Sequence, residues 1–304
     1  MSTQELCGIL NMNKPRGMTS HDVVARVRKI TAQKKVGHAG TLDPLASGVL
    51  LLCLGQATRV AEYLAASDKT YRARLRLGIS TDTYDVEGQI TSQSEVTVSR
   101  AQVEQELQAF RGIQDQIPPM YAAIKYDGIP LYRLARRGQT IARRARKVEI
   151  YNIQLLTWEP PELEIEVHCS KGTYIRSLVH DLGQRLHCGA HLVSLTRIAS
   201  GQFRIAEAIT LEELEQARAK GTLASLLYPL DVALQYFPAV TVDQVTEDKI
   251  ISGQRVRLPS APQDRLCRAY AADGRLLALL RWDKEDFWQP HKVFAQRRDN
   301  EDHS

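Results

Sequence analysis

Six consecutive apolar residues, Val49–Leu54, constrain the fold of this 304-residue chain more than any other stretch. They close the segment "VGHAGTLDPLASGVLLLCLG" and indicate a buried strand that anchors the glycine-rich loop before it. That loop holds one acid, Asp43, followed by Pro44, whose ring fixes the next φ angle. Taken alone, Asp-Pro among glycines is typical of a turn. A carboxylate fixed at the rim of a rigid sheet is also where catalytic groups are often mounted. The pattern leaves both interpretations open.

The rest of the chain interleaves strand and helix patterns. "KTYRARLRLG" alternates apolar residues with arginines, and "ELEIEVHCSKG" alternates in the same way, so both predict half-buried strands. Capped helical patterns begin at Thr19 or Ser20, at Ser99 and at Thr210, and "TYIRSLVHDLGQRL" predicts a further helix. "GISTDTYDVEG" predicts a polar hairpin loop. Several strand pairs suit hairpins better than crossovers, so we expect a mixed α/β (α+β) fold with a largely antiparallel mixed sheet.

A change in pattern near Pro238 divides the chain. Beyond it come short strand-like pieces, with Ala272-Asp273-Gly274 as a hairpin turn. We therefore expect a domain over residues 1–237 and a small β-rich domain over residues 238–304.

Composition bounds the partners and the compartment. The net charge of +5 permits an anionic partner, and no stretch reaches the length of an apolar membrane span. The amino-terminal residues lack an export signal, and five cysteines without a C-x-x-C pair suit a reducing cytoplasm. No sequence feature points to a dimer interface, so a monomer is expected. His187, Cys188 and His191 lack the further ligands of a metal set, and the common nucleotide-binding motifs and the serine-hydrolase elbow are missing, so neither metal nor cofactor is expected.

The segment 133–147, "RLARRGQTIARRARK", carries seven Lys or Arg residues and no acid. It follows a stretch with three tyrosines, Tyr121, Tyr126 and Tyr132. Basic residues interleaved with aromatics favour a nucleic acid, because cations bind phosphates and aromatic rings stack on exposed bases. The candidate contacts to an RNA backbone are Arg136, Arg137, Arg143, Arg144, Arg146 and Lys147.

Five longer blocks together resemble the TruB family of bacterial tRNA pseudouridine-55 synthases. They read "NKPRGMTSHDVV", "GHAGTLDPLASGVLLLCLGQATR", "KTYRARLRLGISTDTYDVEG", "CSKGTYIRSLVHDLG" and "GAHLVSLTRI". The resemblance covers essentially the whole chain and implies a pseudouridine synthase fold with a PUA-like RNA-binding domain at the carboxyl end. It also implies an isomerase that converts uridine to pseudouridine in the tRNA T-loop without a cofactor.

The resemblance also implies roles for single residues. Asp43 matches the essential catalytic aspartate, Arg176 the arginine that pairs with it, and Tyr71 the tyrosine that stacks on the target base and is proposed to remove its C5 proton. The remaining matches are to substrate-binding positions: Tyr174 and Leu195 in the uracil pocket, His38 entering the RNA loop where the flipped nucleotide was, and Lys14 gripping phosphate. The family's comparable basic insertion closes over RNA, so we expect 133–147 to be poorly ordered without RNA.

Three alternatives remain beside this enzyme. One is an RNA-binding or tRNA-folding module that acts without catalysis. Another is the related archaeal and eukaryotic enzyme of guide-RNA particles, which we do not favour because this chain is short at both ends. The third is a ribosomal-RNA pseudouridine synthase, which typically reads "GRLD" around the aspartate, where this chain reads "GTLDP".

Overall fold

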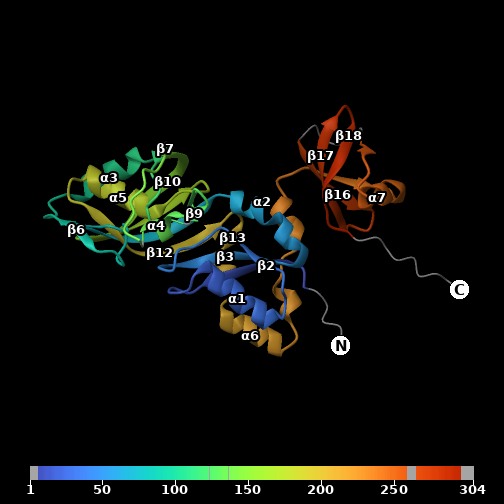
Figure 1. Cartoon of the computed structure of the whole chain (residues 1–304), viewed down its shortest axis with the longest axis horizontal. Helices are drawn as coiled ribbons and strands as arrows, with labels where there is room; N and C mark the ends of the chain where they lie inside the picture. Colours follow the sequence, from blue (N-terminus) through green and yellow to red (C-terminus); the bar gives the residue numbers. More distant parts are fainter. Residues whose placement is uncertain (1–5, 123, 136, 259–264, 296–304) are drawn as a thin grey trace.

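A computed structural model of the chain describes residues 6–122, 124–135, 137–258 and 265–295, without the side chain of Lys125. Its main feature is a nine-stranded sheet (Figure 1). Along the sheet the strands are β1 (Gly8–Lys14), β3 (Ala46–Leu54), β12 (Ala190–Ser200), β4 (Lys69–Leu77), β11 (Glu162–Cys169), β10 (Arg146–Glu159) and β7 (Gly112–Gln116), with β2 (Val36–Ala39) on β3 and β13 (Phe203–Arg204) on β12.

The predicted buried strand is β3, near one end of this sheet. Leu50, Leu52 and Leu54 point into one apolar cluster, while Val49, Leu51 and Cys53 point into a second. A strand covered on both faces needs an unbroken apolar run, which explains the sequence. β3 pairs with β12 in parallel, whereas the other neighbouring strands of the sheet are antiparallel. The predicted mixed sheet is confirmed.

Local sequence signals set the helices of this part. The helices are α1 (Ser20–Thr31), α2 (Ala61–Ala66), α3 (Arg100–Ala109), α4 (Leu131–Ala135), α5 (Ile175–Arg185) and α6 (Leu211–Ala219). Capping boxes begin α1, α3 and α6 at Thr19, Ser99 and Thr210, as the sequence predicts. Thr19 is the N-cap of α1, and Ser20 instead bonds the loop that carries Asp43.

A second sheet of five strands follows. Its order is β14 (Ala239–Val242), β16 (Leu266–Ala271), β17 (Leu276–Lys284), β18 (Phe287–Val293) and β15 (Val256–Arg257), and α7 (Gln244–Ile251) packs on it. The predicted turn at Ala272–Gly274 joins β16 to β17. Leu279 and Phe294 from this unit share an apolar cluster with Val60 and Leu234, so the two units are packed together.

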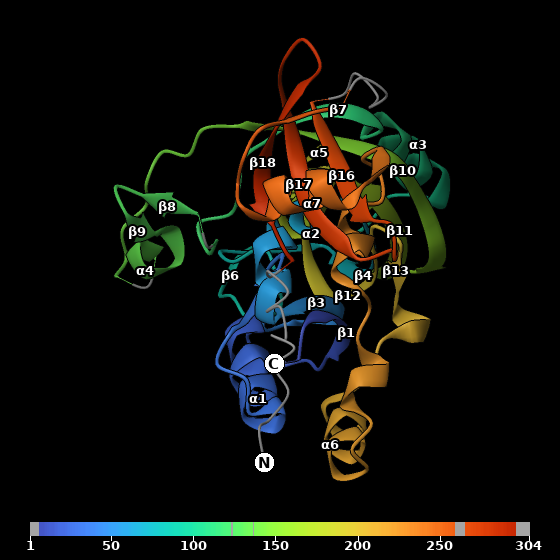
Figure 2. The ribbon, with the colours of Figure 1, turned by 90° about the vertical axis from the view of Figure 1, so that its right-hand side faces the viewer.

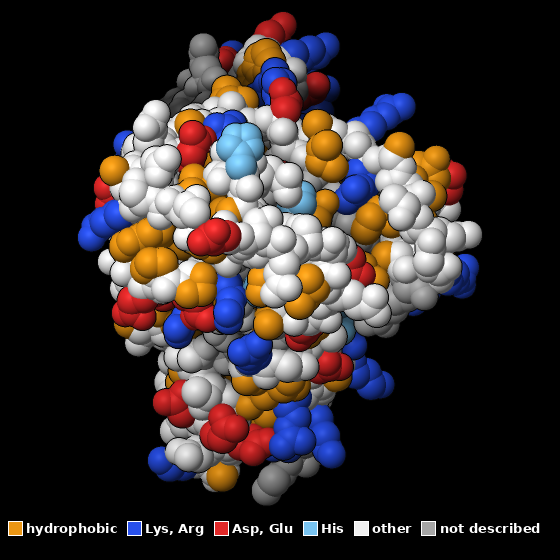
Figure 3. All heavy atoms as spheres, turned by 90° about the vertical axis from the view of Figure 1, so that its left-hand side faces the viewer, with side chains coloured by type: hydrophobic (Ala, Val, Ile, Leu, Met, Phe, Trp, Pro, Cys, Tyr) orange, Lys and Arg blue, Asp and Glu red, His pale blue; other side chains and the backbone are white. Residues whose placement is uncertain are grey.

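Two short hairpins lie outside these sheets. One is formed by β5 (Ile79–Thr81) and β6 (Ile90–Gln93), the other by β8 (Lys125–Tyr126) and β9 (Ile129–Pro130). Figure 2 shows β8, β9 and α4 carried as an arm at the side of the main sheet. Figure 3 shows the face opposite to that of Figure 2. On this face acidic and basic side chains are interspersed and form no continuous basic surface. Within the described residues, no helix is both long enough and apolar enough to span a membrane.

Candidate active site

Asp43 lies in a tight loop between β2 and β3. Gly40 begins the loop and Gly48 lies near the start of β3, both with φ of +97°, a backbone conformation that L side chains rarely adopt. In its middle, the Leu42 N–H donates to the buried Ser20 hydroxyl at 2.9 Å, and that hydroxyl donates back to the Leu42 carbonyl at 3.1 Å. These bonds attach the loop to the first turn of α1, so Asp43 is held on a fixed backbone.

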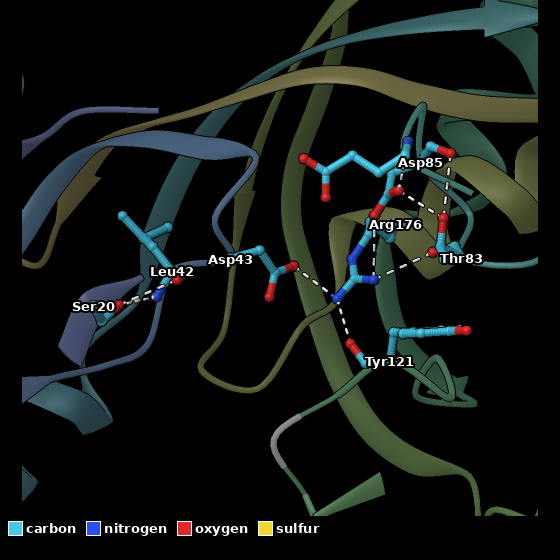
Figure 4. Close-up of polar contacts among 8 residues, drawn as sticks. Ser20, Leu42, Asp43, Thr83, Asp85, Tyr121 and Arg176 are labelled. Carbon is cyan, nitrogen blue, oxygen red and sulfur yellow. Dashed lines mark hydrogen bonds and ion pairs between the residues drawn. The ribbon is translucent and has the colours of Figure 1, made fainter. Parts of the chain in front are cut away.

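Arg176, on the first turn of α5, faces Asp43. Its Nη2 lies 2.8 Å from Asp43 Oδ2, and its Nη1 lies 3.3 Å from Asp85 Oδ2 (Figure 4). The Arg176 side chain is only 5% exposed, whereas that of Asp43 is 38% exposed. The guanidinium is therefore shielded from water while the carboxylate stays open to a substrate. The predicted pairing of Asp43 with Arg176 is present in the structure.

Asp85 is a site residue that sequence reasoning missed. It belongs to "GISTDTYDVEG", which we interpreted as a polar hairpin loop; the hairpin forms, but the Asp85 side chain is 7% exposed. Asp85 Oδ1 accepts from the Thr83 hydroxyl at 2.6 Å and from the Glu87 N–H at 3.1 Å. These donors fix the second carboxylate behind Arg176.

Beside the ion pair lies a cavity of about 330 Å³. Its lining includes Asp43, Tyr71, Tyr174, Arg176, Leu195 and Arg197. Tyr71 on β4 and Leu195 on β12 are buried, and Tyr174 caps the start of α5. The structure thus brings five of the predicted site residues to one cavity: Asp43, Tyr71, Tyr174, Arg176 and Leu195. Aromatic and aliphatic walls beside a carboxylate suit a flat heterocycle attached to a polar sugar.

The hydroxyls of both tyrosines are in a setting that favours their neutral form. Burial raises the pKa of Tyr71, while the charge of Arg197 and a hydrogen bond with it act in the opposite direction. Burial and the negative charge of Asp43 raise the pKa of Tyr174. The Tyr71 hydroxyl therefore stays protonated, so it cannot accept a proton unless a substrate changes its surroundings.

Arg197 is the second site residue that sequence reasoning missed. It is 1% exposed, and it donates from Nε to the Val49 carbonyl at 2.6 Å and from Nη2 to the Gly40 carbonyl at 3.2 Å. The sequence held a signal for its burial. Arg197 alternates with Leu195 and Ala199 along β12, so its side chain points to the same buried face as theirs.

The expectation for Lys14 is wrong. This side chain is fully buried at the end of β1, and its ammonium donates to the carbonyls of Pro15 at 2.9 Å and Met18 at 2.6 Å. Burial lowers its pKa to about 8. Lys14 holds the turn before α1, beneath the Asp43 loop, and cannot reach an external phosphate.

His38 is half-buried on β2, the strand before the Asp43 loop, and its ring packs edge-on against His21 with the ring centroids 5.2 Å apart. Burial and the positive charges of His21 and Arg197 lower its pKa, which favours the neutral ring. It is not part of the cavity wall around Asp43. A role in filling the RNA loop stays a prediction.

The basic side chains of segment 133–147 differ in how exposed they are. Arg137, Arg144, Arg146 and Lys147 are exposed, and Lys147 lies 3.5 Å from Asp115. Arg143 is half-buried and donates to the Pro118 carbonyl at 2.9 Å. Arg136 lies outside the described residues. Among the described residues, no three metal-binding side chains of the His, Cys, Asp or Glu type come together.

Comparison with known proteins decides the family. The model of the TruB pseudouridylate synthase amino-terminal domain matches residues 28–175, and that of the tRNA pseudouridylate synthase B carboxyl-terminal domain matches residues 176–235. "tRNA pseudouridine synthase B" of Dehalococcoides mccartyi (strain CBDB1) is 44% identical over 291 residues, covering 95% of this chain and 97% of the relative. This chain belongs to the TruB family of pseudouridylate synthases.

Further relatives agree with this membership. The protein of the same name from Pseudomonas aeruginosa (strain UCBPP-PA14) is 45% identical over 279 residues, covering 91% of this TruB-family chain and 92% of the relative. Among solved structures, a chain of a Cbf5-Nop10-Gar1 complex matches with a TM-score of 0.76 and 29% identity, covering 96% of this chain and 86% of that one. The mixed α/β pseudouridine synthase fold expected from the sequence is thereby confirmed.

Proposed function

We propose that this chain isomerises uridine to pseudouridine at position 55 in the T-loop of tRNA. The reaction breaks the C1′–N1 bond of the nucleotide and joins C5 of the same base to C1′, and a proton leaves C5 while N1 gains one. Nothing is added or oxidised, so the conversion needs no cofactor. Family membership supports the reaction, and the relatives named tRNA pseudouridine synthase B support tRNA as the substrate.

The single observation that carries the proposal is the ion pair between Asp43 and the buried Arg176, at the edge of a cavity lined by Tyr71 and Leu195. Arg176 orients an ionised carboxylate toward the space where a sugar would lie. From there Asp43 can attack the sugar carbon, stabilise a cationic centre on it or remove a ribose proton. Tyr71 would lie against the base, and the target nucleotide must be flipped out of the RNA fold to enter.

The exposed arginines that follow the arm support a mode of binding in which cations contact the RNA backbone. Arg137 and Arg144 lie in the irregular segment between α4 and β10, and Arg146 is the first residue of β10; all three side chains are exposed. They would contact phosphates of the T-arm, so recognition would rest mainly on RNA shape. The proposal includes closure of this arm over RNA, a monomer, a cytoplasmic location, and a PUA-like RNA-binding role for the unit after residue 237.

The test measures pseudouridine formation on an unmodified tRNA transcript by chemical labelling and primer extension, without added metal or cofactor. We expect one product in the T-loop with the wild type and none with Asp43→Asn, with RNA affinity unchanged. Asp82→Asn is the matched control, because Asp82 is exposed in the β5–β6 loop. A wild type that binds the transcript without forming product would overturn the proposed activity and favour an RNA-binding or tRNA-folding role.

A further inference from the structure

Arg197 connects the two ends of the loop that carries Asp43. Its guanidinium donates two hydrogen bonds: one to the Gly40 carbonyl, where the loop begins, and one to the Val49 carbonyl on β3, the strand that follows the loop. The donating side chain comes from β12, whose backbone pairs with β3 at Arg197 and Gly48. One side chain therefore ties β12 to both ends of the loop.

The two positive-φ glycines on either side of Asp43, Gly40 and Gly48, also lie against Arg197. A Cβ atom at Gly48 would come within 2.3 Å of the Arg197 carbonyl oxygen, which leaves room only for glycine. At Gly40, a Cβ atom would lie 3.7 Å from Arg197 Nη1. The loop thus turns at two positive-φ positions, and both of them contact the same arginine.

Charge makes this arrangement unusual for a purely structural arginine. Among the described residues, no carboxylate forms an ion pair with Arg197, and its bonds go to neutral groups. Two further buried cations, Lys14 and Lys69, lie near Arg197. The pKa of each is lowered to about 8, mainly by burial and further by the positive charge of Arg197. A buried charge without a paired anion is costly, so a side chain that only filled space would be better replaced by an apolar one.

Arg197 also reaches the cavity itself. It lines the cavity with Asp43 and Tyr71, and its charge and hydrogen bonding lower the pKa of the Tyr71 hydroxyl, against the effect of burial. Its backbone is the register partner of Tyr71 in the pairing of β12 with β4. The same guanidinium therefore contacts the loop of the catalytic carboxylate and the residue expected against the base.

We propose that Arg197 is a positioning residue that fixes Asp43 relative to Tyr71. The inference rests on the proposed function, because it assigns Arg197 a part in that reaction. The two bonds leave from different atoms of the guanidinium, Nε and Nη2, whereas a lysine would have to reach both carbonyls from its single Nζ, with different geometry. Displacing a catalytic group by about 1 Å commonly lowers a rate by about 100-fold.

The test compares Arg197→Lys with the wild type in the full-length protein. Arg268→Lys is a matched control, since Arg268 lies in the second unit and donates to two neutral groups, the Phe237 carbonyl at 2.9 Å and the Tyr270 hydroxyl at 3.0 Å. We expect Arg197→Lys to lower the single-turnover rate by about 100-fold with RNA affinity within about twofold of wild type. Hydrogen exchange in residues 40–49 should become faster in Arg197→Lys and stay unchanged in Arg268→Lys.

A second variant separates positioning from stability. Arg197→Ala opens space beside the cavity, and millimolar methylguanidinium should raise its rate by at least about tenfold, whereas potassium at equal ionic strength should not. A wild-type rate and wild-type exchange in Arg197→Lys would overturn the inference, and so would lost RNA affinity with an unchanged rate. A wild type without product would instead count against the proposed function, while the exchange measurement would still decide whether Arg197 holds the loop.

Discussion

At the scale of single residues, Asp85 decides how Arg176 is held. Arg176 lies between two carboxylates and also donates to the carbonyls of Thr83 at 3.2 Å and Tyr121 at 2.7 Å. Replacing Asp85 by Asn keeps the shape and removes one charge-assisted bond, which is worth about 1.5–3 kcal/mol. Without that bond the Arg176 guanidinium would be held less firmly, so it would orient Asp43 less well.

We therefore expect Asp85→Asn to lower the single-turnover rate of pseudouridine formation by about 10- to 100-fold, since about 1.4 kcal/mol corresponds to a factor of ten. RNA affinity should stay unchanged, because Asp85 is buried behind Arg176. Asp82→Asn, in the same loop but exposed, is the control. Equal rates for the two variants would show that Arg176 keeps its position without the second carboxylate.

At the scale of elements, local signals predicted structure well and long-range contacts poorly. The caps at Ser99 and Thr210 were predictable because donor and acceptor lie three residues apart. The alternation of β4 was predictable because one face of the strand is buried. The pair between Asp85 and Arg176 joins residues 91 positions apart, which periodicity does not report. Lys14 was misassigned because its charge says nothing about burial.

The segment that follows α4 exposes arginines that are expected to contact RNA. Residues 137–145 have no regular secondary structure, and Arg137 and Arg144 are exposed there. If they contact phosphates, the double variant Arg137→Gln/Arg144→Gln should weaken RNA binding. The slope of log affinity against log salt concentration should become shallower by about 1.4 to 1.8, because each lost phosphate contact accounts for about 0.7 to 0.9. The single-turnover rate at saturating enzyme should stay close to wild type.

The charge-matched control for that variant takes two arginines from the region of α3. Arg100 and Arg111 are exposed, and Arg100 pairs with Glu104 on its own helix. Arg100→Gln/Arg111→Gln removes the same charge, so a general loss of positive potential would affect both variants alike. An equal change of slope in the two double variants would contradict specific phosphate contacts from the arm.

At the scale of the whole molecule, the two sheets are joined by polar and apolar contacts on α2 and the turn before it. Lys292 pairs with Glu62 and donates to the Arg59 carbonyl, and Arg59 donates to the Val293 carbonyl. The ring of Phe294 is buried in the cluster that both units share, with the Arg59 guanidinium over it at 5.4 Å. This contact orients the second unit relative to the cavity around Asp43.

Phe294→Ala should separate the two units without disturbing that cavity. Truncating a buried phenylalanine costs about 3–5 kcal/mol, and here most of the loss falls on the contact between units. We expect one cooperative unfolding transition for the wild type in denaturant and two for the variant. RNA affinity should fall, because binding must then fix the orientation of the second unit, while the single-turnover rate at saturating enzyme stays unchanged. Trp282→Ala, at a 46% exposed position of β17, is the control. A single transition in Phe294→Ala with unchanged affinity would mean that the polar contacts of Lys292 and Arg59 suffice to hold the units together.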